Sequence, residues 1–172
     1  MGLRALIGIE DADGSYRARP VHYDGCPTAI VPALSVLVHE ELDHDLAAAV
    51  DRLLESSWRR VYALPGFTQM IGVPDEEPGD VLTGRIDATG TDDREWAYLF
   101  GGHRLHVYLG VPTAPFVRKW VPWACWSVSE LPLVPGLELL DVQRAGYRHQ
   151  WLCGDRMAYL AAAKELEMEE AR

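Results

Sequence analysis

Two β-hairpin patterns constrain the fold of this chain more than any other feature. In the first, at about residues 3–24, apolar side chains recur at every second position from Leu3 to Ile9, the period of a strand. Asp13-Gly14 supplies a turn that favours positive φ. As a two-residue loop it places Ile9 opposite Ala18 and Ala5 opposite His22, and a four-residue loop from Asp11 to Gly14 keeps the same faces. A three-residue loop would invert which side chains face the core.

The second hairpin, at about residues 95–109, consists of two aromatic-rich segments on either side of Gly101-Gly102. In the register that a Gly-Gly turn predicts, Trp96 opposes Val107, and this face is apolar. The opposite face, which includes Leu99 and His106, is expected to be wetter.

Helical spacing predicts a long helical segment at about residues 28–56 and a C-terminal helix at about 156–169. In the first of these, Pro32 is expected near the start, because proline is tolerated there. Asp43 or Asp45 could cap its second part, and one bent helix or two helices both remain open. Together with the hairpins, these elements predict a single α+β domain over residues 1–172.

Residues 65–93 are rich in glycine, proline and acidic side chains. Only Val81–Ile86 has the character of a strand. We therefore predict a loop-rich insertion that holds one short strand.

The acidic balance of the chain restricts its partners. Sixteen basic and 26 acidic side chains give a net charge of -10, whereas nucleic-acid binding requires a basic face. The longest apolar run, Thr28–Val38, is shorter than the roughly 20 residues that span a bilayer. We therefore expect neither a nucleic-acid partner nor a membrane segment. Cys26, Cys125 and Cys153 form no CxxC pair, which favours a reducing cytoplasm.

His22 and Asp24 are the candidates for catalysis. On a strand, residues two apart share a face, and a carboxylate beside an imidazole strengthens it as a general base. Alternatively, Asp24 closes a turn before Gly25, and His22 bonds across that turn. Because the local sequence places no nucleophile beside them, the question of an enzyme stays open, and a non-enzyme is favoured.

The segment from His39 to His44 has the composition of a zinc-binding helix but not its spacing. That motif has histidines four apart on one helix face, whereas His39 and His44 are five apart and about 140° apart around an α-helix. We interpret them, with Asp43, as part of a solvated helix face. The sequence predicts no metal site and no cofactor.

Aromatic side chains are the candidate binding residues. Trp120, Trp123 and Trp126, with Tyr23, could form a patch for a partner, and core packing is the alternative. Pro122 confines the tryptophan segment to an edge or irregular strand. On a regular strand, Trp120 and Trp126 would share one face and Trp123 would lie on the other.

The start of the chain resembles a group of small uncharacterised proteins from actinobacteria and bacteriophages. The shared features are the strand Ile7-Gly8-Ile9-Glu10, the Asp13-Gly14 turn and a His-x-Asp-Gly-x-Pro segment at His22–Pro27. Cys26 departs from the group, in which tyrosine commonly precedes the proline. Glu95–Phe100 is similar to part of the group's later hairpin. The resemblance implies a cytoplasmic accessory protein associated with mobile elements or phage biology, and it carries no activity.

These observations favour a non-enzymatic interaction protein that binds a protein partner through an acidic and aromatic surface. The alternative is a small hydrolase or ligand-binding domain centred on His22 and Asp24. A monomer and a homodimer are both compatible with the sequence.

Overall fold

The computed structural model describes residues 3–64, 68–77, 79–88, 90–91, 94–114 and 117–131, and the expected C-terminal helix lies outside them. The described strands are β1 (Ala5–Glu10), β2 (Ser15–Val21), β3 (Trp58–Tyr62), β4 (Ile71–Pro74), β5 (Leu82–Arg85), β6 (Gly90–Thr91), β7 (Trp96–Gly101), β8 (Arg104–Ala114) and β9 (Val117–Ser127). The helical elements are α1 (Pro27–Val36), the π-helix η1 (Leu37–Glu41), α2 (Leu46–Leu54) and the 3-10 helix η2 (Val128–Glu130).

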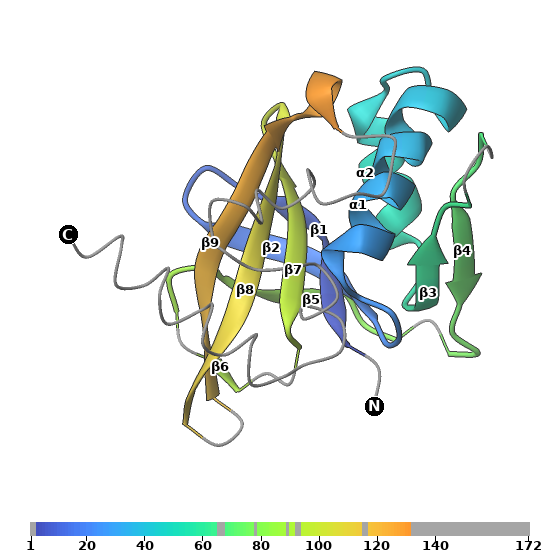
Figure 1. The fold of residues 1–172 in the computed structure, drawn as a ribbon. Helices are drawn as coiled ribbons and strands as arrows, with labels where there is room; N and C mark the ends of the chain where they lie inside the picture. The colour runs from blue at the N-terminus through green and yellow to red at the C-terminus, as the bar shows by residue number, and fades with distance from the viewer. Residues whose placement is uncertain are drawn as a thin grey trace.

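The strands form one mixed sheet in the order β4-β3-β2-β1-β7-β8-β9-β6, with β5 also paired to β2. β1 lies near the centre, antiparallel to β2 and parallel to β7. The chain from β7 to β9 is an antiparallel meander. Helices α1 and α2 lie together on one side of the sheet, beside β3 and β4 (Figure 1). The predicted α+β class is therefore confirmed for the described residues.

β5 and β6 bridge two distant strands of this sheet. β5 pairs with Ser15–Ala18 of β2, whereas Val21 of the same strand pairs with β3. After a turn, β6 pairs with the first two residues of β9. The sheet from β2 through β1, β7 and β8 to β9 therefore curves into a ring, with β5 on its β2 side and β6 on its β9 side. Between β5 and β6 themselves the ring has no strand pairing among the described residues.

Two apolar clusters fill the two faces of the sheet. The larger one packs α1 and α2 against alternate residues of β1, β7 and β8, including Ile7, Tyr98 and Val107. The smaller one lies on the opposite face, which the ring encloses, and consists of Leu6, Tyr16, Ala18, Ala97, Leu99, Tyr108 and Trp120. The expectation of a wetter face around Leu99 was therefore wrong, because Leu82 of β5 and Ile86 just after it pack against this face.

The first hairpin is present, but its predicted register was wrong by one residue. Ile9 pairs with Arg17, and Ala5 pairs with Val21 rather than with His22. Since successive side chains of a strand point to opposite faces, this shift inverts the predicted faces of the returning strand.

The cause of the shift is a three-residue loop. Asp11 N donates a hydrogen bond to Ser15 O at 2.8 Å, which leaves Ala12–Gly14 as the loop. Gly14 adopts a φ of 79°, a conformation that glycine reaches without strain. The Asp13 carboxylate accepts hydrogen bonds from the hydroxyl and the backbone N–H of Ser15, and these bonds lower the pKa of Asp13 below its ordinary value.

The second hairpin has the predicted faces although its turn lies elsewhere. Trp96 pairs with Leu109 rather than Val107, and the strands meet at Gly102-His103. Gly102 takes the positive φ of 59°. Because the register moves by two residues, each side chain stays on its predicted face.

The helical segment is divided into two α-helices joined by the π-helical turn η1. Asp45 caps α2, since its Oδ1 accepts a hydrogen bond from Ala48 N at 3.0 Å. Pro32 lies inside α1 rather than at its start, because the helix begins at Pro27, where a first-turn proline is favourable. None of the described helices is long and apolar enough to cross a membrane.

Two irregular regions differ from expectation. Residues 65–93 contain three strands among their described positions. β5 is the predicted short strand, whereas β4 and β6 were not predicted. In β9, the pairing with β8 skips Trp123 beside Pro122, so the strand is irregular as predicted. This extra residue puts Trp126 with Trp123 against the larger cluster, whereas Trp120 lies in the smaller one. The prediction that Trp126 shares a face with Trp120 was therefore wrong, whereas Trp123 lies opposite Trp120 as predicted.

Gly8 offers a test of this packing. A Cβ at Gly8 would lie 2.1 Å from Arg17 O and 2.6 Å from Ala18 Cα, so β1 and β2 would have to separate. We expect Gly8→Ala to lower the free energy of unfolding by at least about 2 kcal/mol in urea denaturation. Gly101→Ala is the control, because its nearest heavy atom would be 3.4 Å away. Equal losses in the two variants would contradict the close approach.

Candidate functional site

The structure gives His22 and Asp24 separate partners. His22 Nε2 lies 2.8 Å from Asp75 Oδ2, in the segment after β4. Asp24 adopts a φ of 57°, and its Oδ2 lies 3.1 Å from Arg60 Nε on β3. The carboxylate beside the His22 imidazole is therefore that of Asp75, not that of Asp24.

The backbone of this segment continues the pairing of β2 with β3. His22 N and Tyr23 N donate hydrogen bonds to the carbonyls of Trp58 and Arg59, both at 2.9 Å. These bonds hold Tyr23 above the outer end of the sheet, where its side chain is 46% exposed.

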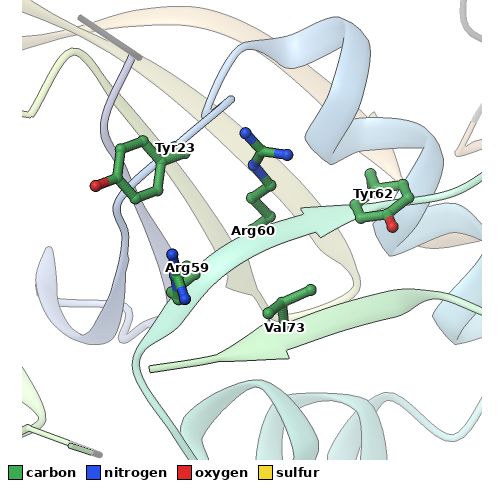
Figure 2. A pocket seen from close by; sticks show the side chains of 5 residues that line it. All are labelled: Tyr23, Arg59, Arg60, Tyr62 and Val73. Atoms are coloured by element: carbon green, nitrogen blue, oxygen red, sulfur yellow. The ribbon is translucent and has the colours of Figure 1, made fainter. Parts of the chain in front are cut away.

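A pocket of about 320 Å³ lies at this place. Figure 2 shows the side chains that line it: Tyr23 after β2, Arg59, Arg60 and Tyr62 on β3, and Val73 on β4. A second hollow of about 330 Å³ adjoins it, lined by Arg59, Asp75, Glu76 and Glu77. We call the residues of the two hollows together the β3–β4 surface.

This surface combines exposed apolar groups with charge. Tyr23 and Val73 are two of the four exposed large apolar side chains among the described residues. Three acidic side chains stand next to them, with Arg59 between the two hollows. Among the described residues, the Arg59 guanidinium has no hydrogen-bond or ion-pair partner. Aromatic and apolar groups beside charged ones are typical of surfaces that bind other proteins.

A second polar site lies inside the ring, at the C-terminal end of β1. The Tyr108 hydroxyl donates a hydrogen bond to Glu10 Oε2 at 2.7 Å, and His106 Nδ1 lies 3.0 Å from the same oxygen. The Glu10 side chain is only 11% exposed. Burial, and then the contact with Glu10, raise the pKa of Tyr108 above its ordinary range, so Tyr108 acts as a hydrogen-bond donor at neutral pH.

Two further side chains border this cluster. Cys125 is exposed and stands opposite His106 in the β8–β9 register. Arg104 Nε donates a hydrogen bond to Cys125 Sγ at 2.9 Å. A carboxylate beside an imidazole, as Glu10 stands beside His106, is an arrangement that commonly supports proton transfer.

His39 and His44 meet at the end of η1. Their Nδ1 atoms are 3.0 Å apart, although the sequence predicted rings on different sides of an α-helix. Burial, and then the neighbouring His44 imidazole, lower the pKa of His39, whereas Glu40 acts in the opposite direction. The expectation of a simple solvated helix face was therefore incomplete, since the chain turns here as a π-helix.

The predicted tryptophan patch is divided between the two clusters. Trp120 is 7% exposed and packs inside the ring, and Trp123 and Trp126 are partly buried against the larger cluster. Of the four predicted binding residues, Tyr23 is the one that is exposed and lines a pocket.

Sequence reasoning missed most of the residues around Tyr23. The stretch Trp58–Tyr62 was not predicted as a strand, although aromatic and β-branched residues at both its ends favour one. Asp75 belongs to a run that reads only as a polar loop. Its contact with His22 depends on the β3–β4 pairing, which no local pattern indicates.

Comparison with known proteins adds no assignment, because no protein family, curated protein or solved structure matches the chain.

Tyr108→Phe tests the polar cluster inside the ring. The variant removes the hydroxyl that bonds to a largely buried carboxylate, and we expect a loss of about 1.5–3 kcal/mol in the free energy of unfolding. Tyr62→Phe is the control, because its hydroxyl forms no hydrogen bond with a described residue. Urea denaturation of both variants measures the difference. A loss in Tyr108→Phe no larger than that of the control would show that the bond contributes nothing.

Proposed function

We propose that this protein is a non-enzymatic accessory protein that binds a protein partner through the β3–β4 surface. The observation that carries the proposal is the pair of adjoining hollows, one lined by the exposed Tyr23 and Val73 and the other by Asp75, Glu76 and Glu77. An acidic and aromatic surface of this kind suits a basic partner segment with an apolar side chain as its anchor.

The charge of the whole chain supports the same partner. A net charge of -10 attracts basic molecules and accelerates their encounter at low salt. The acidic run next to the pocket then fixes where such a segment binds. The Arg59 side chain, between the hollows, can donate hydrogen bonds to a carboxylate or backbone carbonyl of the bound segment.

The topology supports an extended partner segment. β4 ends the order of the described strands, so its outer edge pairs with none of them. An exposed strand edge can pair with the backbone of a bound peptide while pockets take its side chains.

The resemblance to actinobacterial and bacteriophage proteins supports the accessory role in this proposal. It favours a cytoplasmic accessory role associated with mobile elements, and the segment that carries it, His22–Pro27, contains Tyr23 of the β3–β4 surface. The proposal therefore assigns the shared segment a role in binding.

A phage-displayed library of random peptides tests this function. We expect selection on the full chain to enrich peptides that combine lysine or arginine with an aromatic or aliphatic residue. Tyr23→Ala should weaken their binding at least about tenfold, the effect of losing an interface anchor. Glu76→Gln combined with Glu77→Gln should weaken binding and reduce its dependence on salt.

The matched control combines Asp51→Asn on α2 with Glu55→Gln just after it, which removes the same charge from exposed positions elsewhere. If the control weakens binding as much as the Glu76 and Glu77 variant, the attraction comes from net charge and not from this surface. If no basic peptide is enriched, or if Tyr23→Ala binds as well as the wild type, the proposed function is wrong.

A second candidate function is a small hydrolase that uses His22. The observation that favours it is the 2.8 Å contact of His22 with Asp75, a carboxylate that can orient an imidazole as a general base. Hydrolysis of p-nitrophenyl acetate tests it. An enzyme would lose this activity in His22→Ala and in Asp75→Asn, but not in the control His103→Ala. Equal rates in all three variants would exclude His22 as a base for this ester.

A further inference from the structure

The π-helical turn brings together two histidines that an α-helix would separate. Leu42 N donates a hydrogen bond to Leu37 O at 3.1 Å, and His44 N donates one to Val38 O at 2.8 Å. The first bond joins residues five apart, the pattern that defines a π-helix, and such turns are rare but often lie at functional sites. The second joins residues six apart and folds the chain back after the turn. As a result, the rings of His39 and His44 lie with their centroids 4.7 Å apart.

The two Nδ1 atoms lie 3.0 Å apart and share a hydrogen bond. We propose that His39 and His44 exchange this bond for a divalent transition-metal ion bound through the same two atoms. This site is independent of the β3–β4 surface. Imidazole nitrogen is a preferred ligand of Cu²⁺, Ni²⁺ and Zn²⁺, and metal–nitrogen distances are about 2.0–2.1 Å.

The distance between the nitrogens indicates which ions fit best. Two nitrogens about 2.1 Å from one metal are about 3.0 Å apart in neighbouring positions of a square or octahedron, and about 3.4 Å apart in a tetrahedron. The observed separation matches the spacing for Cu²⁺ or Ni²⁺, so the rings need only turn until both nitrogens point at the ion instead of at each other. Zn²⁺ would require the rings to open by a few tenths of an ångström.

The backbone holds the two rings in place without a metal. Asp43 and His44 adopt φ values of 47° and 67°, a region that residues other than glycine rarely occupy. Asp45 begins α2 immediately afterwards, with its side chain bonded to Ala48 N. The end of a helix explains why Asp43 has a left-handed conformation. It does not explain why residues 39 and 44 are both histidines.

The site is open on one side. His44 is exposed and His39 is partly buried, so an ion can reach both nitrogens from solvent. Within the part of the chain that the structure describes, no third histidine, cysteine or carboxylate completes a metal cluster. The ion would therefore keep positions for water or for a ligand of another molecule, as catalytic and bridging metals do.

Calorimetric titration of the full chain, freed of metal with EDTA, tests the proposal. We expect one Ni²⁺ or Cu²⁺ ion to bind, and His39→Gln and His44→Gln each to weaken binding at least about tenfold. His103→Gln is the matched control, an exposed histidine in the β7–β8 turn. Bound metal should also raise the midpoint of thermal unfolding in the wild type and the control.

Nitrogen NMR of the six histidines with Zn²⁺ provides a second measurement. We expect the Nδ1 resonances of His39 and His44 to shift, and those of His22, His103 and His106 to stay. Because His44 is exposed, His44→Gln is expected to fold, and circular dichroism checks this. Binding that survives in His44→Gln, binding that falls equally in His103→Gln, or the absence of any binding would each overturn the proposal.

Discussion

The parallel pairing of β1 with β7 is the interaction on which the rest of the structure depends. It aligns Ala5–Ile9 with Trp96–Phe100 and so joins the N-terminal hairpin to the meander that follows much later in the chain. Both faces of β1 are buried, since Ile7 packs under the helices and Leu6 packs inside the ring, each with no exposed surface. Gly8 makes this arrangement possible, because any side chain there would push β2 away.

The same pairing places the polar groups at the two ends of the ring. Glu10 ends β1 and meets His106 and Tyr108. At the other end, Glu95 accepts a hydrogen bond from Arg4 N at 2.8 Å and lies 3.8 Å from the nearly buried Arg118 guanidinium. Between these ends the ring is filled by apolar side chains. A buried charge requires a partner, and each carboxylate therefore lies where the interior meets other polar groups.

Local patterns predict the elements of this fold better than their partners. The alternation around Gly102 predicted the faces of the second hairpin correctly, since moving the turn by one residue shifts the register by two and leaves each side chain on the same face. The predicted faces of the first hairpin were inverted because the sequence does not distinguish a glycine in a three-residue loop from one in a two-residue loop. The closure by β5 and β6 and the contact of His22 with Asp75 involve residues far apart in the chain, and periodicity carries no information about them.

The β3–β4 surface is joined to the sheet by few backbone pairs, yet side chains fix it firmly. β2 and β3 share the register pair Val21–Trp58, extended by the backbone bonds of His22 and Tyr23. Trp58 is 3% exposed, and its Nε1 donates a hydrogen bond to Leu53 O at 2.9 Å, which ties β3 to the end of α2. Arg19 donates hydrogen bonds to the carbonyls of Leu54 and Gly79 and so connects β2 to α2 and to the chain after β4. These contacts fix the conformation of the β3–β4 surface before a partner binds, and such preorganisation reduces the entropy lost on binding.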